Sequence, residues 1–206
     1  MSPLLPTLVL IGPHGAGKTT LGRALAARLR LPFHAELGFE LARDAGWRPV
    51  GATAADTGSD TAAAFDQELF ARELARDLAW PRAHPRIVET WHPGNLAYAA
   101  RRSPGVAAAW LPALVRACRR SRVLVLPLTA PRPVLARRQH EPGDLDFFLD
   151  VGASASAWAR ELGLPCLPPL DCASAPAEAL AERVLARLAA RPSRLRPLLP
   201  TPSRGG

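Results

Sequence analysis

The chain has 206 residues and a mass of 22.0 kDa, which suits one domain with a substantial core and is cramped for two. Hydrophobic residues make up 48% and charged residues 21% of it, an ordinary composition for a soluble globular protein. No apolar run approaches the roughly 20 residues of a membrane-spanning helix, and the N-terminus MSPLLPT lacks the basic start of a signal peptide. We therefore expect a cytoplasmic protein without a membrane partner.

The formal net charge is +8, which taken alone would favour a nucleic-acid partner. The excess positive charge, however, is scattered along the chain and lies partly in the tail at 192–206. All but one of the basic residues are arginines, the exception being Lys18. We therefore expect no nucleic-acid partner.

Apolar runs that predict strands alternate along the chain with stretches of helical periodicity. The predicted strands are 7–12, 32–37, 86–90, 122–128 and 164–170. The predicted helices are 18–31, 38–46, 61–80, 103–120, 132–139, 146–163 and 174–190. Alternating strands and helices build a parallel sheet with helices on both faces. The sequence therefore predicts a three-layer α/β/α fold with a mainly parallel five-stranded sheet, with its chemistry at the carboxyl ends of the strands.

The segment GPHGAGKTT, at 12–20, matches the phosphate-binding pattern G-x-x-x-x-G-K-[ST] between a predicted strand and a predicted helix. Glycines let such a loop turn its backbone N–H groups inward, and the helix N-terminus adds its dipole. Lys18 would reach the β- and γ-phosphates of ATP, and the Thr19 hydroxyl would bind Mg²⁺. The predicted nucleotide-binding residues are Gly12, Pro13, His14, Gly15, Ala16, Gly17, Lys18, Thr19 and Thr20. His14 could either contact phosphate or only fill space.

Two classes of P-loop protein are disfavoured. A signalling GTPase reads guanine with N-K-x-D, which cannot exist here because Lys18 is the only lysine. Motor and AAA-type ATPases usually carry an acid at the end of their most apolar strand, but VLVLPL leads into Thr129 with no acid. The acid lies instead at the end of RIVE, as Glu89. These absences favour a small-molecule kinase.

The segment LIGPHGAGKTTLGRALAARLRLPF resembles the opening of P-loop small-molecule kinases, including shikimate and gluconate kinases. The layout beyond it is similar to the nucleoside and nucleotide (thymidylate-type) kinases, in which an acid ends the third strand and an arginine-bearing lid follows the fourth. Here these features are ETWHPGNLAYA at 89–99 and ARRQHEPGD at 136–144. The resemblance covers most of 7–190. It implies phosphoryl transfer from ATP, with Mg²⁺, to a small molecule, and a nucleoside or nucleotide is the expected acceptor.

The resemblance also implies roles for individual residues. Glu89 would take a proton from the acceptor hydroxyl or hold Mg²⁺ through water. Arg137 and Arg138 would close a lid over the phosphates, unless they only form a solvated helix face. Residues 169–175, PLDCASA, lie where such a kinase holds adenine by backbone contacts.

Four further residues are predicted to contact the acceptor. Trp91, His92 and Asn95 form a polar and aromatic loop after the third strand, suited to stacking on a ring and reading its edge. The alternative is a packed loop with Trp91 in the core. Glu36, after the second strand, could bind acceptor hydroxyls or the metal, or could be a solvated carboxylate.

The sequence departs from the resembling families near the acceptor. Shikimate kinases carry Asp-x-Asp after strand 2, where this chain has His-Ala-Glu at 34–36. Nucleoside kinases place arginine after the strand-3 acid, where this chain has Thr90. A shikimate- or gluconate-type kinase and a P-loop ATPase acting as a regulatory switch therefore stay open as alternatives.

The predicted organisation is one kinase domain at 1–191, with a mobile loop at 48–63 and a lid at about 132–150. The Pro- and Arg-rich tail at 192–206 is predicted to be disordered. The sequence leaves the oligomeric state open and is compatible with a dimer.

Overall fold

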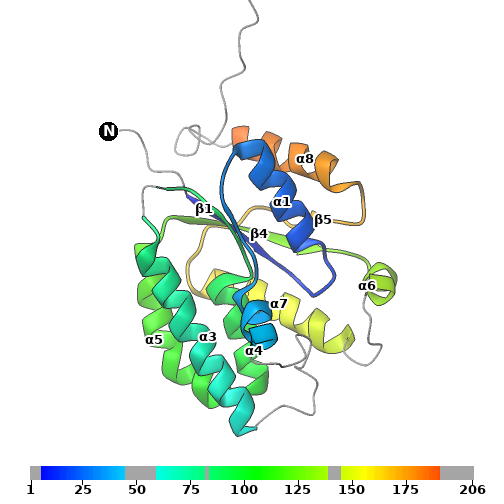
Figure 1. The fold of residues 1–206 in the computed structure, drawn as a ribbon. Helices are drawn as coiled ribbons and strands as arrows, with labels where there is room; N and C mark the ends of the chain where they lie inside the picture. Colours follow the sequence, from blue (N-terminus) through cyan, green and yellow to red (C-terminus); the bar gives the residue numbers. More distant parts are fainter. Residues whose placement is uncertain (1–5, 45–58, 82–83, 139–144, 191–206) are drawn as a thin grey trace, which may run out of the picture.

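The computed structural model describes residues 6–44, 59–81, 84–138 and 145–190 (Figure 1). Most of the predicted loop at 48–63, residues 139–144 of the predicted lid and the tail at 192–206 lie outside the described residues.

Five strands form one sheet in which every pairing is parallel, in the order β2-β3-β1-β4-β5. The strands are β1 (Thr7–Ile11), β2 (Phe33–His34), β3 (Ile87–Glu89), β4 (Val123–Thr129) and β5 (Leu170–Asp171). The helices are α1 (Lys18–Leu29), α2 (Leu37–Asp44), α3 (Asp60–Ala79), α4 (Trp91–Arg102), α5 (Pro104–Arg120), α6 (Arg132–Arg138), α7 (Leu145–Glu161) and α8 (Ala177–Ala189). The prediction of a mainly parallel five-stranded sheet is confirmed.

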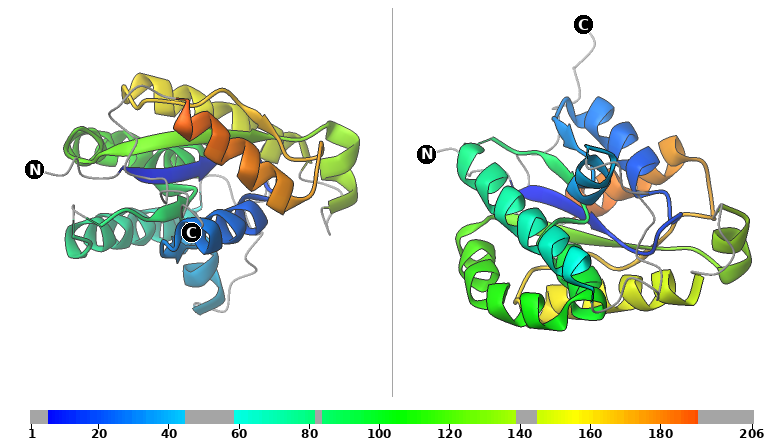
Figure 2. Two further views of the ribbon diagram at one scale, coloured as in Figure 1. Left: turned by 90° about the horizontal axis from the view of Figure 1, so that it is seen from above. Right: turned by 60° about the horizontal axis from the view of Figure 1, so that its bottom comes forward.

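The sheet lies between two layers of helices, as the views in Figure 2 show. Alternate residues of β1 and β4 point to opposite faces, as the period of two in a strand requires. Leu8, Leu10 and Leu126 pack with α1 and α8 on one face. Val9 and Val125 pack with α4 and α7 on the other face. The three-layer α/β/α prediction is therefore confirmed.

Two local predictions differ from the structure. The segment 89–95 is not a loop, because helix α4 begins at Trp91 and runs through Pro93 and Gly94. Proline is tolerated in the first turn, where its missing N–H would have no partner in the helix. The predicted strand 164–170 narrows to the two residues of β5, preceded by an isolated parallel bridge between Val125 and Cys166. It lies at the edge of the sheet, and its prolines explain why it pairs so little.

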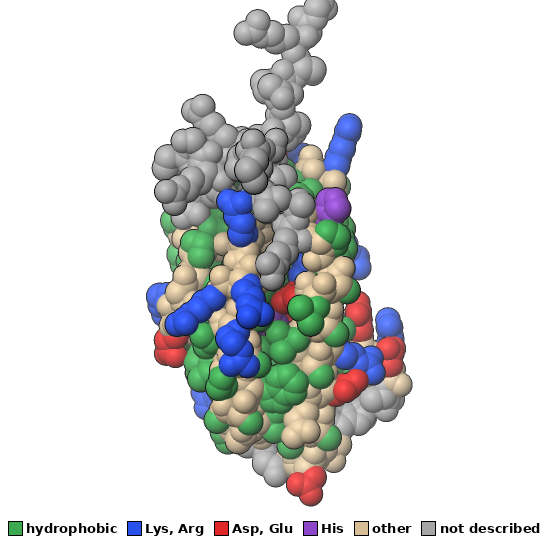
Figure 3. All heavy atoms as spheres, turned by 90° about the vertical axis from the view of Figure 1, so that its left-hand side faces the viewer, with side chains coloured by type: hydrophobic (Ala, Val, Ile, Leu, Met, Phe, Trp, Pro, Cys, Tyr) green, Lys and Arg blue, Asp and Glu red, His purple; other side chains and the backbone are tan. Residues whose placement is uncertain are grey.

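The surface carries many of the arginines noted in the sequence. On the face shown in Figure 3, several basic side chains gather near the middle, among hydrophobic and uncharged ones. Among the described residues, no helix is both long and apolar enough to cross a membrane.

Helix α7 approaches the backbone of the phosphate-binding loop very closely at Gly152. A Cβ atom on Gly152 would lie 2.6 Å from Cδ and 2.7 Å from the nitrogen of Pro13. We predict that Gly152→Ala lowers the free energy of unfolding by about 1–3 kcal/mol, because the helix and the loop must separate to admit the methyl group.

The matched control is Gly105→Ala on α5, where an added Cβ would meet nothing within 4 Å. Urea denaturation of the two variants and the wild type measures the difference. Equal stability of the two variants would contradict the close packing of α7 on the loop.

Candidate active site

The loop between β1 and α1 has a backbone that only glycine adopts easily at three positions. Gly12 has φ 145°, Gly15 has φ 77°, and Gly17, which precedes α1, has φ 91°. A Cβ on Gly12 would lie only 2.4 Å from the carbonyl oxygen of Leu128 on β4. No side chain caps the N-terminus of α1, so its first N–H groups suit an anion. The loop therefore fits the triphosphate predicted from the sequence.

Lys18 is nearly buried, with 5% of its surface exposed. Its Nζ donates to the carbonyl oxygens of Gly12 at 3.2 Å and Pro13 at 3.3 Å. Within the described part of the chain these partners are neutral, and Lys18 forms no ion pair. A buried cation with only neutral partners favours an anionic ligand, which fits the phosphates.

Thr19 and Glu89 meet although they are far apart in the sequence. The Thr19 hydroxyl lies 3.0 Å from Oε1 and 2.9 Å from Oε2 of Glu89 and donates to this carboxylate. The contact exists because β3 pairs with β1, with Glu89 in register with Leu10. A hydroxyl beside a carboxylate fits Mg²⁺, which takes few protein ligands and completes its shell with water and phosphate. Accordingly, the described residues contain no cluster of three or more His, Cys, Asp or Glu suited to a metal.

Glu36 brings a second carboxylate to this end of the sheet. Its Oε2 accepts a hydrogen bond of 2.8 Å from the hydroxyl of Thr90. Thr90 has φ 67°, a conformation that a β-branched residue rarely adopts, and its N–H donates to the carbonyl of Leu10 at 2.8 Å. The pKa of Glu89 is raised, first by burial and then by the negative charge of Glu36, against the opposing effect of Lys18.

These groups line a cavity of about 650 Å³, here called the outer cavity. It is lined by His14, Gly15, Gly17, Lys18, Thr19, Thr20, Leu21, Ala35, Glu36, Phe39, Glu89, Arg138, Cys172, Ala175, Pro176, Ala177 and Leu180. It runs from the phosphate-binding loop to the segment between β5 and α8. Two residues of the predicted adenine segment, Cys172 and Ala175, are therefore part of its wall.

The two predicted lid arginines differ in position. Arg138 lines the outer cavity, and its Nη1 donates to the carbonyl of Gly15 at 3.1 Å. Arg137, also on α6, is exposed and is absent from the cavity wall. Only Arg138 is therefore placed to face a bound triphosphate.

A smaller cavity of about 30 Å³, here called the inner cavity, adjoins the outer one. It is lined by His14, Glu36, Gly38, Phe39, Phe65, Leu69, Asn95, Tyr98, Arg102 and Phe148. His14, Glu36 and Phe39 belong to both walls. The His14 ring lies 5.7 Å from that of Phe39 and 5.0 Å from that of Phe148. Aromatic rings and a few polar groups are typical of a site for a small molecule.

Two of the predicted acceptor residues lie away from both cavities. Trp91 and His92 are almost fully buried, and neither lines a cavity wall. Trp91 Nε1 donates to Asp77 at 3.0 Å, and His92 Nε2 lies 2.8 Å from the same carboxylate. Their contact with the acceptor stays a prediction, while α4 turns both side chains into the core, which was the alternative given for Trp91. Asn95, one turn further along, does line the inner cavity.

Sequence reasoning missed Asp66, Glu73 and Asp77 on α3. All three carboxylates are buried or nearly so. Their spacing of seven and four residues places them on one helical face. Their helical spacing on an otherwise apolar face was the signal in the sequence, because it predicts buried acids, and buried acids need partners.

Comparisons with known proteins agree with this geometry. A family model described as AAA domain matches residues 7–169, which is most of the chain. The chain belongs to this AAA domain family. Within this domain the acid lies at the end of β3, as Glu89, and β4 ends in Thr129.

Among curated proteins, a shikimate kinase from Thermobifida fusca is 39% identical over 83 residues, which are 40% of this chain and 43% of that enzyme. A shikimate kinase from Pseudomonas fluorescens is 69% identical over 26 residues, 13% of this chain and 15% of the enzyme. The matches thus span less than half the length of these relatives.

Solved structures show the same fold over about nine tenths of the chain. The NadR protein, solved in complex with NR, gives a TM-score of 0.67 at 14% identity and covers 91% of this chain and 53% of that one. Shikimate kinase from Acinetobacter baumannii, in complex with shikimate, gives 0.54 at 18% identity and covers 89% and 92%. These likenesses show that the three-layer α/β/α fold predicted from the sequence is shared with these proteins.

The raised pKa of Glu89 predicts a pH-dependent stability. Because the folded state holds this proton more tightly than the unfolded chain, unfolding releases it between the ordinary value of 4.5 and the raised pKa. The wild type therefore loses stability as the pH rises through this window. We predict that Glu89→Gln, which still accepts from Thr19, lacks this loss.

Urea denaturation at a series of pH values, without Mg²⁺ or nucleotide, measures the effect. The control is Glu161→Gln, at an exposed carboxylate near the end of α7. Parallel pH profiles for wild type and Glu89→Gln would contradict the burial of a charged Glu89.

Proposed function

We propose that this protein transfers the terminal phosphoryl group of ATP, with Mg²⁺, to a hydroxyl group of a small molecule. The observation that carries the proposal is the meeting of two sets of groups at one point. Lys18 and Thr19 form the phosphate end, and Glu36 and Glu89 bring two carboxylates beside it. The inner cavity opens at the same place through shared wall residues.

The phosphate end is built to hold negative charge. The N–H groups at the start of α1 and the Lys18 ammonium would bind the triphosphate. Thr19 and Glu89 would hold Mg²⁺, which neutralises phosphate charge when bound. Arg138, whose Nη1 donates to the carbonyl of Gly15, would add a second cation. Phosphoryl transfer depends mainly on such positioning and neutralisation.

The carboxylates have separate tasks. Holding Mg²⁺ and taking the proton of the acceptor hydroxyl are alternative roles of Glu89. Its raised pKa favours the second role, because a carboxylate that binds a proton more tightly than usual is a better base at neutral pH. Glu36 is fixed by the Thr90 hydroxyl and would orient the acceptor hydroxyl toward the phosphate end. Both roles require the acceptor to enter between the inner cavity and the phosphate-binding loop.

We infer a nucleoside-like acceptor from the walls of the inner cavity. Phe39, Phe65, Tyr98 and Phe148 offer four aromatic faces, and a flat ring packs well between such faces. A shikimate- or gluconate-type hydroxy acid is the second candidate, supported by the partial sequence matches to shikimate kinases.

A third reading, a switch that hydrolyses ATP slowly, differs from both in one measurable respect. A kinase releases ADP faster when an acceptor is present, whereas a switch does not. Coupled ADP release with pooled nucleosides, nucleoside monophosphates and hydroxy acids separates these readings. Turnover that no pool raises would contradict the kinase proposal.

Removal of the loop lysine tests the phosphate end of the site. Lys18→Ala takes away a buried cation that would contact the transferred phosphoryl group, so kcat should fall by about 10²-fold or more. The fold should survive, because Lys18 bonds only to carbonyls of its own loop. Acceptor-dependent ADP release measures kcat, and circular dichroism checks the fold. Full activity in the folded variant would contradict the assignment.

The two arginines of α6 test the role of the lid, and one of them serves as the control for the other. Arg138→Ala should lower kcat by about 10-fold or more, because it removes a cation from the phosphate end. Arg137→Ala changes an exposed neighbour outside the cavity wall and should keep wild-type turnover. Equal losses in the two variants would show that α6 acts only through its overall charge.

A further inference from the structure

The charged residues around the inner cavity restrict the charge of the acceptor as well as its shape. Resting on the proposed function, we infer that the acceptor pocket takes an uncharged or positively charged hydroxyl compound and rejects anionic ones. Hydroxy acids and phosphorylated acceptors are therefore disfavoured, and an unphosphorylated nucleoside is favoured. The inference depends on three residues of the described wall. Arg102 is paired with an acid, Glu36 forms no ion pair with any described residue, and the side-chain amide of Asn95 is held by a hydrogen bond.

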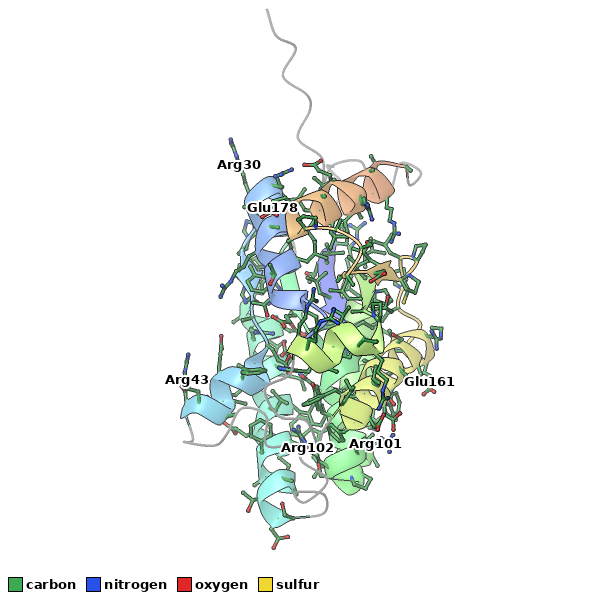
Figure 4. The ribbon with its side chains drawn as sticks, turned by 90° about the vertical axis from the view of Figure 1, so that its right-hand side faces the viewer. Arg30, Arg43, Arg101, Arg102, Glu161 and Glu178 are labelled. Atoms are coloured by element: carbon green, nitrogen blue, oxygen red, sulfur yellow. The ribbon has the colours of Figure 1, made fainter. Side chains whose placement is uncertain are left out.

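The arginine of the inner cavity is already paired. Arg102 Nη2 and Nε donate to Asp66, whose side chain is fully buried. Ser103 donates to the same carboxylate at 2.5 Å. If Arg102 turned toward an acceptor carboxylate, Asp66 would keep a buried charge without its counter-ion, which is strongly unfavourable. Figure 4 shows Arg102 beside α3, whereas Arg43 points away from the molecule.

Aromatic rings also hold this guanidinium in place. Its central carbon lies 5.2 Å from the ring centre of Phe65 and 5.3 Å from that of Tyr98. Contacts of this kind stabilise a cation over a ring face. Arg102 is therefore a fixed part of a neutral pair with Asp66 and supplies no net charge for binding an anion.

The acidic group of the cavity has no such compensation. Among the described residues, Glu36 forms no ion pair, and its partner is the neutral hydroxyl of Thr90. A bound anion would face this carboxylate directly, and like charges in a desolvated site repel. A cation, by contrast, would meet a carboxylate and aromatic faces together, which attract it.

Asn95 adds the requirement that the bound molecule carries hydrogen-bond donors. Its Nδ2 donates to Glu73 at 3.4 Å, and Glu73 also accepts from Arg76. One N–H of this amide is thus taken by Glu73, and among the described residues the amide oxygen of Asn95 has no donor, so it is available to accept from a bound molecule. Together, Glu36 and Asn95 present acceptors, so the molecule must bring hydroxyl or N–H donors, as the hydroxyl-rich sugar of a nucleoside does.

The remaining cations of the described site belong to the nucleotide. Lys18 and Arg138 line the outer cavity and not the inner one. A ring does not fit the inner cavity at about 30 Å³ unless a side chain turns away. Phe39, 36% exposed on the short helix α2, has room to do so. Opening the cavity in this way exposes a further aromatic face but adds no cation from the described wall.

The test compares acceptors that differ by one negative charge: uridine with orotidine, and shikimate methyl ester with shikimate. Phosphoryl transfer from Mg·ATP is measured for each as kcat/KM. We expect the uncharged member of a pair to be favoured by about 10-fold or more, as repulsion from Glu36 implies. The KM for ATP should be the same with both members.

A substitution makes the test specific to the ion pair. Asp66→Asn removes the counter-charge of Arg102 and should raise kcat/KM for the anionic member, so that the ratio within each pair falls by about 10-fold. Asp150→Asn is the matched control, because it releases Arg101, the neighbour of Arg102, from an exposed ion pair. This control should leave the ratio unchanged.

The outcomes separate the inference from the proposed function. Preference for the anionic members by the wild type would overturn the inference while leaving the kinase in place. An unchanged ratio in folded Asp66→Asn would also overturn it. If Asp66→Asn does not fold, the wild-type ratio decides. If the wild type phosphorylates none of the four compounds nor any other nucleoside or hydroxy acid, the proposed function fails and the inference fails with it.

Discussion

The hydrogen bond between Thr19 and Glu89 is the contact on which the site depends. It joins the start of α1 to the end of β3, two segments that meet only because β3 lies beside β1 in the sheet. This order brings an acid next to the phosphate-binding loop without any motif that links them in sequence. Glu36 and Thr90 follow the carboxyl ends of β2 and β3, so they and the inner cavity lie at the same end of the strands.

Behind that edge, α3 supplies three buried acids that fix the polar side of α4. Asp66 pairs with Arg102, Glu73 with Asn95 and Asp77 with Trp91. Each pair joins a charge that cannot be left alone in the interior to a group on α4. On this side of the site, Arg102 and Asn95 line the inner cavity and are oriented by acids that do not line it.

A second set of contacts holds Glu36 in place. Arg76 bonds to Glu73 and also donates to the carbonyl of Ala35 at 3.3 Å. The chain before Glu36 is thus tied to the same helix that holds Asn95. On the other side, Thr90 holds the carboxylate itself at the cost of an unusual backbone conformation, and such strain is typical of functional sites. These two ties place the carboxylate at the junction of the outer and inner cavities.

The sheet and the nucleotide end could be predicted because both depend on local signals. Apolar runs specify buried parallel strands, and the spacing of Gly12, Gly17 and Lys18 specifies a phosphate loop. The acceptor end could not be predicted so well, because Pro93 and Gly94 look like a loop although α4 includes them in its first turn. A loop at this place led to the prediction that Trp91 and His92 contact the acceptor, with a core position for Trp91 as the alternative. Arg102 and Phe148 join the cavity only through tertiary packing, for which no single-sequence pattern exists.

The fate of the terminal phosphate of ATP tests the central claim most directly. With ATP labelled at the γ-phosphorus and a mixture of nucleosides and hydroxy acids, the label can be followed by chromatography. The account predicts that it appears in an organic phosphate, and that Glu89→Gln slows its appearance. Release of all the label as inorganic phosphate, at a rate that no acceptor changes, would contradict it.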